Sequence, residues 1–332
     1  MKQKLIQEIC NLMEHHLNKT QIQILAHTLE IVFEKSAVFP SEQRESAMTI
    51  QEQNLKLIDL FLAAKRIEGC SENTVKYYKK TLTPIVNSFD KCIHHIETND
   101  LRLYLSSYQN TRHSSKVTLD NVRRIMSTFF SWLEDEDYIL KSPVRRIRKV
   151  KTTQTVKEAM SDEQLEMLRD HCTHPRDLAI IDLLVSTGIR VGELVNLNIT
   201  DINFHDRECI VLGKGDKERR VYFDAKTKIH LQQYVDSRSD SNSALFVSKH
   251  APWNRLNISG VERFLSELGK KSSVHHVHPH KFRRTMATMA IDKGMPIEQV
   301  QKLLGHSQID TTLRYAIVNQ TNVKHSHRKF VY

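Results

Sequence analysis

A basic stretch broken by a proline divides this sequence into two parts. Residues 141–157 contain arginines and lysines throughout but no acidic side chain. Ser142 and Pro143 predict the end of a helix here, because the residue before a proline disfavours the α conformation. We therefore expect two domains joined by a basic linker over 143–157.

The charge of the chain favours a polyanionic partner. The 332 residues carry a formal net charge of +10, and the isoelectric point is about 9.3. Two domains with buried cores fit this length, and a nucleic acid fits this charge better than a membrane surface does. The linker is then either an ordinary solvated run or a place of contact with a nucleic-acid backbone.

Cysteine usage and hydropathy indicate the compartment. The five cysteines are scattered and show no C-x-x-C spacing, which favours a reducing environment over a disulfide framework or a zinc site. The N-terminus lacks an apolar leader, and the most apolar run, Leu178–Val185, is short and interrupted by Asp182. We expect a soluble cytoplasmic protein.

Residues 1–50 form a predicted N-terminal helical extension whose role the sequence does not indicate. Leu5, Ile9, Leu12 and His16 share one helical face. Thr20 and Gln23 have the spacing of a capping box that would start a second helix. So small an amphipathic pair needs a partner surface, on this chain or on a neighbouring subunit.

Residues 51–142 carry apolar side chains at helical spacing, which predicts an all-helical bundle. Ser71 is the expected cap of one helix. A later helix presents an apolar face made of Val122, Ile125, Met126, Phe129, Phe130 and Leu133. The basic residues on these helices fit either contact with phosphates or a solvated face.

Residues 158–332 are predicted to be mostly helical with one β-hairpin. Helices are expected to begin at Ser161 and Pro279 and to end at Gly188 and Gly305. Cys209–Leu212 and Arg219–Phe223 form the expected strands, joined by a turn at Gly213–Lys217. The turn matches neither a P-loop nor a dinucleotide fingerprint.

Six polar residues of this region form a set suited to attack on a phosphodiester: Arg190, Lys214, His280, Arg283, His306 and Tyr315. Taken alone, Lys214 is a solvated lysine at a hairpin tip. His280 and Arg283 share one helical face at i and i+3. The nearby His275, His276 and His278 leave a metal site open as an alternative, although no carboxylate or thiolate stands at ligand spacing beside them.

These residues lie in segments that resemble the tyrosine recombinase (phage integrase) family. The matching segments are Thr187–Leu194, Gly213–Gly215, His280 with Arg283, Leu304–His306, and Thr311 and Thr312 with Tyr315. Their order and spacing agree from about residue 158 to residue 320, and residues 51–142 resemble the family's core-binding domain. Two features depart from the pattern: Arg284 stands where the family often has histidine, and the first fifty residues match no part of the common core.

The resemblance implies a role for each residue. Tyr315 would attack the scissile phosphate and form a 3′-phosphotyrosyl bond, while Arg190 and Arg283 hold the non-bridging oxygens. Lys214 would protonate the departing 5′-oxygen. His280 would accept the tyrosine proton and His306 would bind the phosphate, although these two imidazoles could exchange roles. Glu193 would either hold the site in place or be an ordinary solvated helix acid.

The resemblance also implies a mainly α fold, in which a SAM-like core-binding domain precedes a mostly helical catalytic domain with a small antiparallel sheet. The implied partner is a double-stranded DNA recombination site, on which a homotetramer exchanges strands through a Holliday junction with no metal, cofactor or membrane. The tail over 316–332 would pack on a neighbouring subunit. The alternatives are relaxation of DNA as by a type IB topoisomerase and a DNA-binding accessory factor without catalysis.

Overall fold

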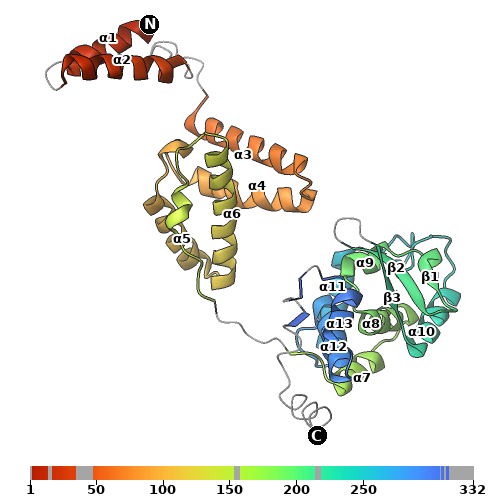
Figure 1. The fold of residues 1–332 in the computed structure, drawn as a ribbon. Coiled ribbons are helices and arrows are strands. Elements are labelled where there is room, and N and C mark those ends of the chain that lie inside the picture. Colours follow the sequence, from red (N-terminus) through yellow and green to blue (C-terminus); the bar gives the residue numbers. More distant parts are fainter. Residues whose placement is uncertain are drawn as a thin grey trace. The chain divides into compact units, whose positions relative to one another are not determined.

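The chain forms two compact units, residues 1–153 and 154–332 (Figure 1). The computed structural model describes residues 2–13, 17–34, 48–152, 158–213, 218–306, 308–309 and 312–313. Within these residues the fold is mainly α with one small antiparallel sheet, which confirms the predicted fold class. None of the described helices is both long and apolar enough to cross a membrane.

The chain begins with two helices that pack against each other, α1 (Lys2–Met13) and α2 (Lys19–Glu34). The capping box that starts α2 is formed by Asn18 and Gln21, whose side chains each accept from the other's backbone N–H at 3.0 and 2.9 Å. The predicted box at Thr20 and Gln23 is therefore wrong, because asparagine is a strong N-cap residue and starts the helix before Thr20. The predicted apolar face also includes the Leu12 side chain and His16, which lie outside the described residues.

Four longer helices build the rest of the first unit: α3 (Ile50–Ile67), α4 (Glu72–Asn87), α5 (Thr98–Arg112) and α6 (Lys116–Asp135). The short 3-10 helix η2 (Ile93–His95) precedes α5. Ser71 caps α4 as predicted. The predicted apolar face of α6 is buried, and the Phe129 ring packs edge-on against Phe61 of α3 with centroids 5.2 Å apart.

Helix α6 ends earlier than the sequence predicts. It stops at Asp135, followed by Asp137 in the left-handed region with φ of 58°, so the predicted helix end at Ser142 and Pro143 is wrong. Pro143–Arg146 form a second 3-10 helix, η3. Val144 is buried, and the Val150 N–H donates to Asp120 of α6 at 3.0 Å. These contacts hold the first part of the basic stretch against the helices.

The second unit combines helices with the sheet. Its helices are α7 (Asp162–Asp170), α8 (Pro175–Thr187), α9 (Val191–Asn196), η4 (Ile199–Asp201), α10 (Ala225–Asp236), α11 (Ile258–Lys271), α12 (Pro279–Asp292) and α13 (Ile297–Leu304). The strands β1 (Ile202–Asn203), β2 (Glu208–Leu212) and β3 (Glu218–Tyr222) pair in that order, antiparallel. The predicted strand pairing is confirmed, with Cys209 opposite Val221 and both side chains buried.

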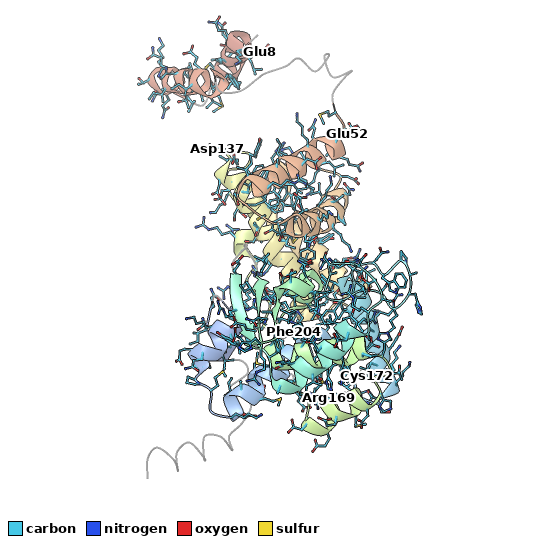
Figure 2. All side chains as sticks on the ribbon, turned by 90° about the vertical axis from the view of Figure 1, so that its right-hand side faces the viewer. Glu8, Glu52, Asp137, Arg169, Cys172 and Phe204 are labelled. Carbon is cyan, nitrogen blue, oxygen red and sulfur yellow. The ribbon has the colours of Figure 1, made fainter. Side chains whose placement is uncertain are left out.

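Helix α8 is the centre of this unit and packs against α10 and α12 (Figure 1). It also carries a buried charge: the Asp182 carboxylate accepts from Arg169 Nε of α7 at 2.7 Å and contacts the His230 ring of α10. Arg169 and Cys172 mark the end of α7 in Figure 2. This ion group joins the three helices α7, α8 and α10.

Two glycines shape those helix ends. Gly188 ends α8 with φ of 61°, and Gly305 ends α13 with φ of 63°. Residues other than glycine rarely adopt this left-handed conformation. A Cβ on Gly188 would lie 2.2 Å from the Met286 methyl group of α12. The chain can therefore turn sharply at both points and bring their backbone carbonyls toward α12 and α9.

Candidate active site

Arg190 occupies the N-cap position of α9, two residues after Gly188, the C-cap of α8. Its backbone N–H donates to Glu193 Oε2 at 2.7 Å, and its Nη1 donates to Glu193 Oε1 at 2.8 Å. The Nη2 atom donates to the Gly305 carbonyl at 3.1 Å. About a third of the Arg190 side chain remains exposed (33%), so this guanidinium is held in place and can still reach a ligand.

Glu193 is a buried anion at the centre of this arrangement. Its side chain is 4% exposed, which makes the interpretation as a solvated helix acid wrong. Arg219 of β3 donates to both carboxylate oxygens, at 2.6 and 2.7 Å. Burial raises the pKa of the carboxyl, but the hydrogen bonds from Arg219 and Arg190 outweigh burial and lower the pKa overall. Glu193 is therefore charged at neutral pH.

Arg219 was not among the residues predicted from the sequence. A usable signal exists in strand alternation: Arg219 shares its side of β3 with Val221, which is fully buried. An arginine that points inward from a strand needs an acidic or carbonyl partner. Glu193 and the Leu303 carbonyl, at 3.0 Å from Arg219 Nε, meet this need.

Arg283 joins the two helix ends. It lies on α12 and is 3% exposed. Its Nη1 donates to the Gly188 carbonyl at 2.6 Å, and its Nη2 donates to the Leu304 carbonyl. The backbone at the ends of α8 and α13 thus fixes this guanidinium beside Arg190, which itself binds the Gly305 carbonyl.

Two imidazoles lie near these cations. His280 is on the first turn of α12, and partial desolvation and the charge of Arg283 lower its pKa. His306 directly follows Gly305, and its Nδ1 is 2.8 Å from the hydroxyl of buried Thr312. Burial, then the charges of Arg283 and Arg190, lower the pKa of His306 to about 4. Both rings are therefore neutral at neutral pH, available to exchange a proton or to bind an anion.

Of the six residues predicted from sequence, four come together around the ends of α8 and α13: Arg190, His280, Arg283 and His306. Lys214 and Tyr315 lie outside the described residues. Three guanidiniums and one carboxylate give the described part of the site an excess of positive charge. This arrangement suits a bound anion such as a phosphate.

The structure gives His278, one of the histidines of the alternative metal site, a role as a helix cap. The His278 Nδ1 atom accepts from the Lys281 N–H at 3.1 Å, so this ring caps α12. Across the described part of the chain, no group of three histidine, cysteine or acidic side chains is arranged to hold a metal ion.

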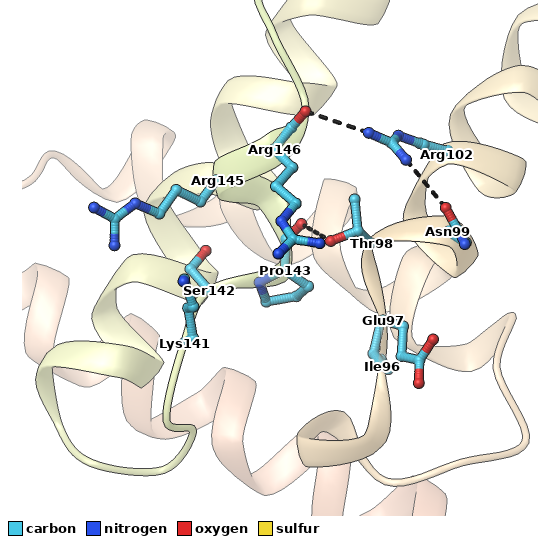
Figure 3. A pocket seen from close by; sticks show the side chains of 10 residues that line it. All are labelled: Ile96, Glu97, Thr98, Asn99, Arg102, Lys141, Ser142, Pro143, Arg145 and Arg146. Atoms are coloured by element: carbon cyan, nitrogen blue, oxygen red, sulfur yellow. Dashed lines mark hydrogen bonds between the residues drawn. The ribbon is translucent and has the colours of Figure 1, made fainter.

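A second basic feature lies in the first unit, where η3 meets the start of α5 (Figure 3). A cavity of about 430 Å³ is lined by four cations, Arg102, Lys141, Arg145 and Arg146, and by one carboxylate, Glu97, together with smaller side chains. Arg102 donates to Asn99 at 3.1 Å and to the Arg146 carbonyl at 3.5 Å. Within the described residues, none of the four cations forms an ion pair with a carboxylate. The basic residues of the stretch 141–157 thus gather partly around one cavity.

Comparison with known proteins gives consistent matches. The profile of the phage integrase family matches residues 157–322, and that of the phage integrase N-terminal SAM-like domain matches residues 57–140. The tyrosine recombinase XerC of Oceanobacillus iheyensis is 31% identical over 290 residues, which cover 82% of this chain and 94% of the relative.

Two solved structures are similar in fold. The Tn1549 transposon integrase in complex with a circular-intermediate DNA has a TM-score of 0.67 at 20% identity, covering 85% of this chain and 99% of the other. The XerH recombinase bound to a palindromic difH substrate, a post-cleavage complex, has a TM-score of 0.65 at 17% identity, covering 98% and 93%.

The low pKa of His306 leads to a prediction about its titration. In the free protein, NMR of the ring protons should give a midpoint near 4. Arg190→Gln removes a nearby cation and should raise this midpoint, which still stays below 6.5 because the ring remains half-buried. Arg220→Gln makes the same charge change on β3 away from this ring and should leave it unaltered. A wild-type midpoint at 6.5, the ordinary value, would contradict the described environment.

The lowered pKa of His306 also makes the stability of the fold depend on pH. The folded-state pKa of His306 lies below its ordinary value of 6.5. Neutral His306 therefore contributes stability that is present above about pH 6.5 and is lost as the pH falls toward 4, because the unfolded chain binds the proton more tightly.

Proposed function

This chain belongs to the phage integrase family of tyrosine recombinases, and we propose that it cuts and rejoins duplex DNA at specific sites through a covalent 3′-phosphotyrosyl intermediate. The observation that carries this proposal is the pair of guanidiniums, Arg190 and Arg283, fixed by backbone carbonyls beside two neutral imidazoles. A phosphodiester is the substrate that such a set fits best.

The two arginines would bind the non-bridging oxygens of the scissile phosphate. Each donates to backbone carbonyls or to Glu193, which orients both guanidinium planes before DNA binds. Donors fixed in advance stabilise the charge of the pentacovalent transition state without reorganisation. Loss of one such donor typically slows a reaction by ~10²–10³-fold.

Tyr315 is the proposed nucleophile. Its phenolic oxygen would form a bond to phosphorus while the bond from phosphorus to the 5′-oxygen breaks, which leaves a 5′-hydroxyl. A phenol with a pKa near 10 costs about 4 kcal/mol to ionise at pH 7, so a proton acceptor and nearby cations must assist. His280 is the proposed acceptor, and Lys214 the proposed donor to the 5′-oxygen.

His306 would bind the phosphate as a neutral ring. Its Nδ1 contact with Thr312 orients the imidazole. A hydrogen bond at one ring nitrogen determines whether the other nitrogen donates or accepts. The low pKas of His280 and His306 support a proton acceptor at either position. The division of roles between them rests on the family resemblance.

The reaction would be reversible without a metal or a nucleotide. The phosphotyrosyl bond retains the energy of the broken phosphodiester, so a 5′-hydroxyl from another strand can attack it. Four active sites in a homotetramer on paired recombination sites would exchange strands two at a time through a Holliday junction. The complexes of the Tn1549 integrase and XerH with DNA support duplex DNA as the partner.

The first unit would act as the core-binding domain, with residues 1–50 as an extension to it. The cavity between η3 and α5 is a proposed binding place for the DNA backbone, because its four cations have no carboxylate partner among the described residues. Phosphate contacts of this kind add affinity and salt dependence without reading the sequence.

A nicked suicide duplex tests the nucleophile. In such a substrate the fragment carrying the 5′-hydroxyl diffuses away and traps the intermediate. Wild type should form a covalent protein–DNA adduct, and Tyr315→Phe should form none. Tyr222→Phe, an exposed tyrosine on β3, is the control and should form the adduct normally. An adduct that persists in Tyr315→Phe would refute the assignment.

Salt dependence tests DNA-backbone binding by the first unit. The double variant Arg145→Ala with Arg146→Ala should bind DNA more weakly. It should also reduce the slope of log K against log salt by about 0.9 for each phosphate that the protein no longer neutralises. The control is Lys65→Ala with Arg66→Ala, which removes equal charge from residues already paired with Glu68 and Glu72. Equal slopes for the two double variants would exclude this binding place.

A further inference from the structure

Arg219 of β3 contacts two other elements of the proposed active site, α9 and the end of α13. Its two terminal nitrogens donate to the two oxygens of Glu193, at 2.6 and 2.7 Å. Its Nε donates to the Leu303 carbonyl at 3.0 Å. The side chain is 12% exposed. One guanidinium thus ties β3 to α9 and to the end of α13.

The backbone at Gly305 accommodates this arginine closely. A Cβ on Gly305 would lie 3.0 Å from Arg219 Cδ and 3.2 Å from Arg219 Nε. The glycine therefore serves two purposes: it adopts the positive φ that ends α13, and it leaves space for the guanidinium. The segment that Arg219 supports continues directly into His306, and the Gly305 carbonyl accepts from Arg190.

The next residue on the strand is a natural contrast. Arg220 is opposite Ile210 in the sheet and pairs with Glu208 at 2.9 Å, with 56% of its side chain exposed. The two arginines have the same charge and adjacent positions, but only Arg219 faces the site, because side chains alternate along a strand.

We propose that Arg219 is a positioning residue for phosphate binding, which holds Glu193 and the Leu303–Gly305 backbone so that Arg190 and His306 keep their places. This inference rests on the proposed function. The hydrogen bonds of Arg219 go to Glu193 and the Leu303 carbonyl. It therefore acts through Glu193, which contacts Arg190 with both carboxylate oxygens.

The electrostatics explain why loss of Arg219 would disturb Arg190. Glu193 is buried, and a buried carboxylate needs both charge compensation and hydrogen bonds. Without Arg219, Arg190 would be its one remaining ion-pair partner among the described residues. Arg190 would then be drawn toward Glu193, and its charge would be less available to a phosphate.

The test compares two duplexes in single-turnover adduct formation with the full chain at saturating DNA. One has a normal scissile phosphate. In the other, a neutral methyl group replaces one non-bridging oxygen, which removes charge that Arg190 would otherwise neutralise. The variants are Arg219→Gln and the matched control Arg220→Gln.

On the normal phosphate, Arg219→Gln should slow adduct formation by roughly 10- to 100-fold, the size of effect found when a residue that orients a metal ligand is lost. On the methylphosphonate, the ratio of the wild-type rate to the Arg219→Gln rate should fall toward one. Arg220→Gln should match wild type at saturating DNA on both duplexes.

Two results would overturn the inference while leaving the proposed function intact. One is a wild-type rate for Arg219→Gln on the normal phosphate. The other is an equal deficit on both duplexes, which would mean that Arg219 supports the fold and not phosphate binding. Absence of any wild-type adduct on either duplex would overturn the proposed function and this inference with it.

Discussion

The Glu193 carboxylate, buried between Arg219 and Arg190, is the interaction on which the rest of the site depends. A buried charge is costly unless it is paired and hydrogen-bonded, and here each oxygen accepts from two donors. This requirement fixes two arginines from distant parts of the chain in one place. The guanidinium of Arg190 is then oriented before any ligand arrives, which is the arrangement that electrostatic catalysis requires.

Backbone carbonyls at two helix ends provide the second part of the arrangement. Helices α8 and α13 each end at a glycine with positive φ, and the last carbonyls of a helix lack partners within it. Arg283 and Arg190 donate to carbonyls at these ends. The positive guanidiniums also suit the negative end of a helix dipole. The same hydrogen bonds that complete the helices therefore position the cations and place His306 beside them.

Local signals in the sequence predict much of this fold, because caps and glycine stops act over a few residues. Ser71, Ser161, Gly188 and Gly305 mark real helix boundaries. The sequence prediction missed the capping box of Asn18, because Thr20 and Gln23 show the same spacing. It also missed the early end of α6, because Ser142 and Pro143 are a stronger stop signal than Asp137. The motif residues Arg190, His280, Arg283 and His306 do lie together, but their catalytic roles, and those of Lys214 and Tyr315, stay predictions. Strand alternation would have marked Arg219 as pointing inward, but its partner Glu193 could be identified only from the tertiary fold. The contact between Thr312 and His306 likewise depends on how the chain turns after α13.

A double-mutant cycle between Glu193 and Arg219 tests most directly whether this buried ion pair organises the site. Adduct formation would be measured at saturating DNA for Glu193→Gln, Arg219→Gln and the double variant. If the pair acts as one unit, the double variant should be little slower than the slower single variant, with a coupling energy of about 0.5–3 kcal/mol. Rate losses that simply multiply would show that the two residues act independently and would contradict a site organised by this pair.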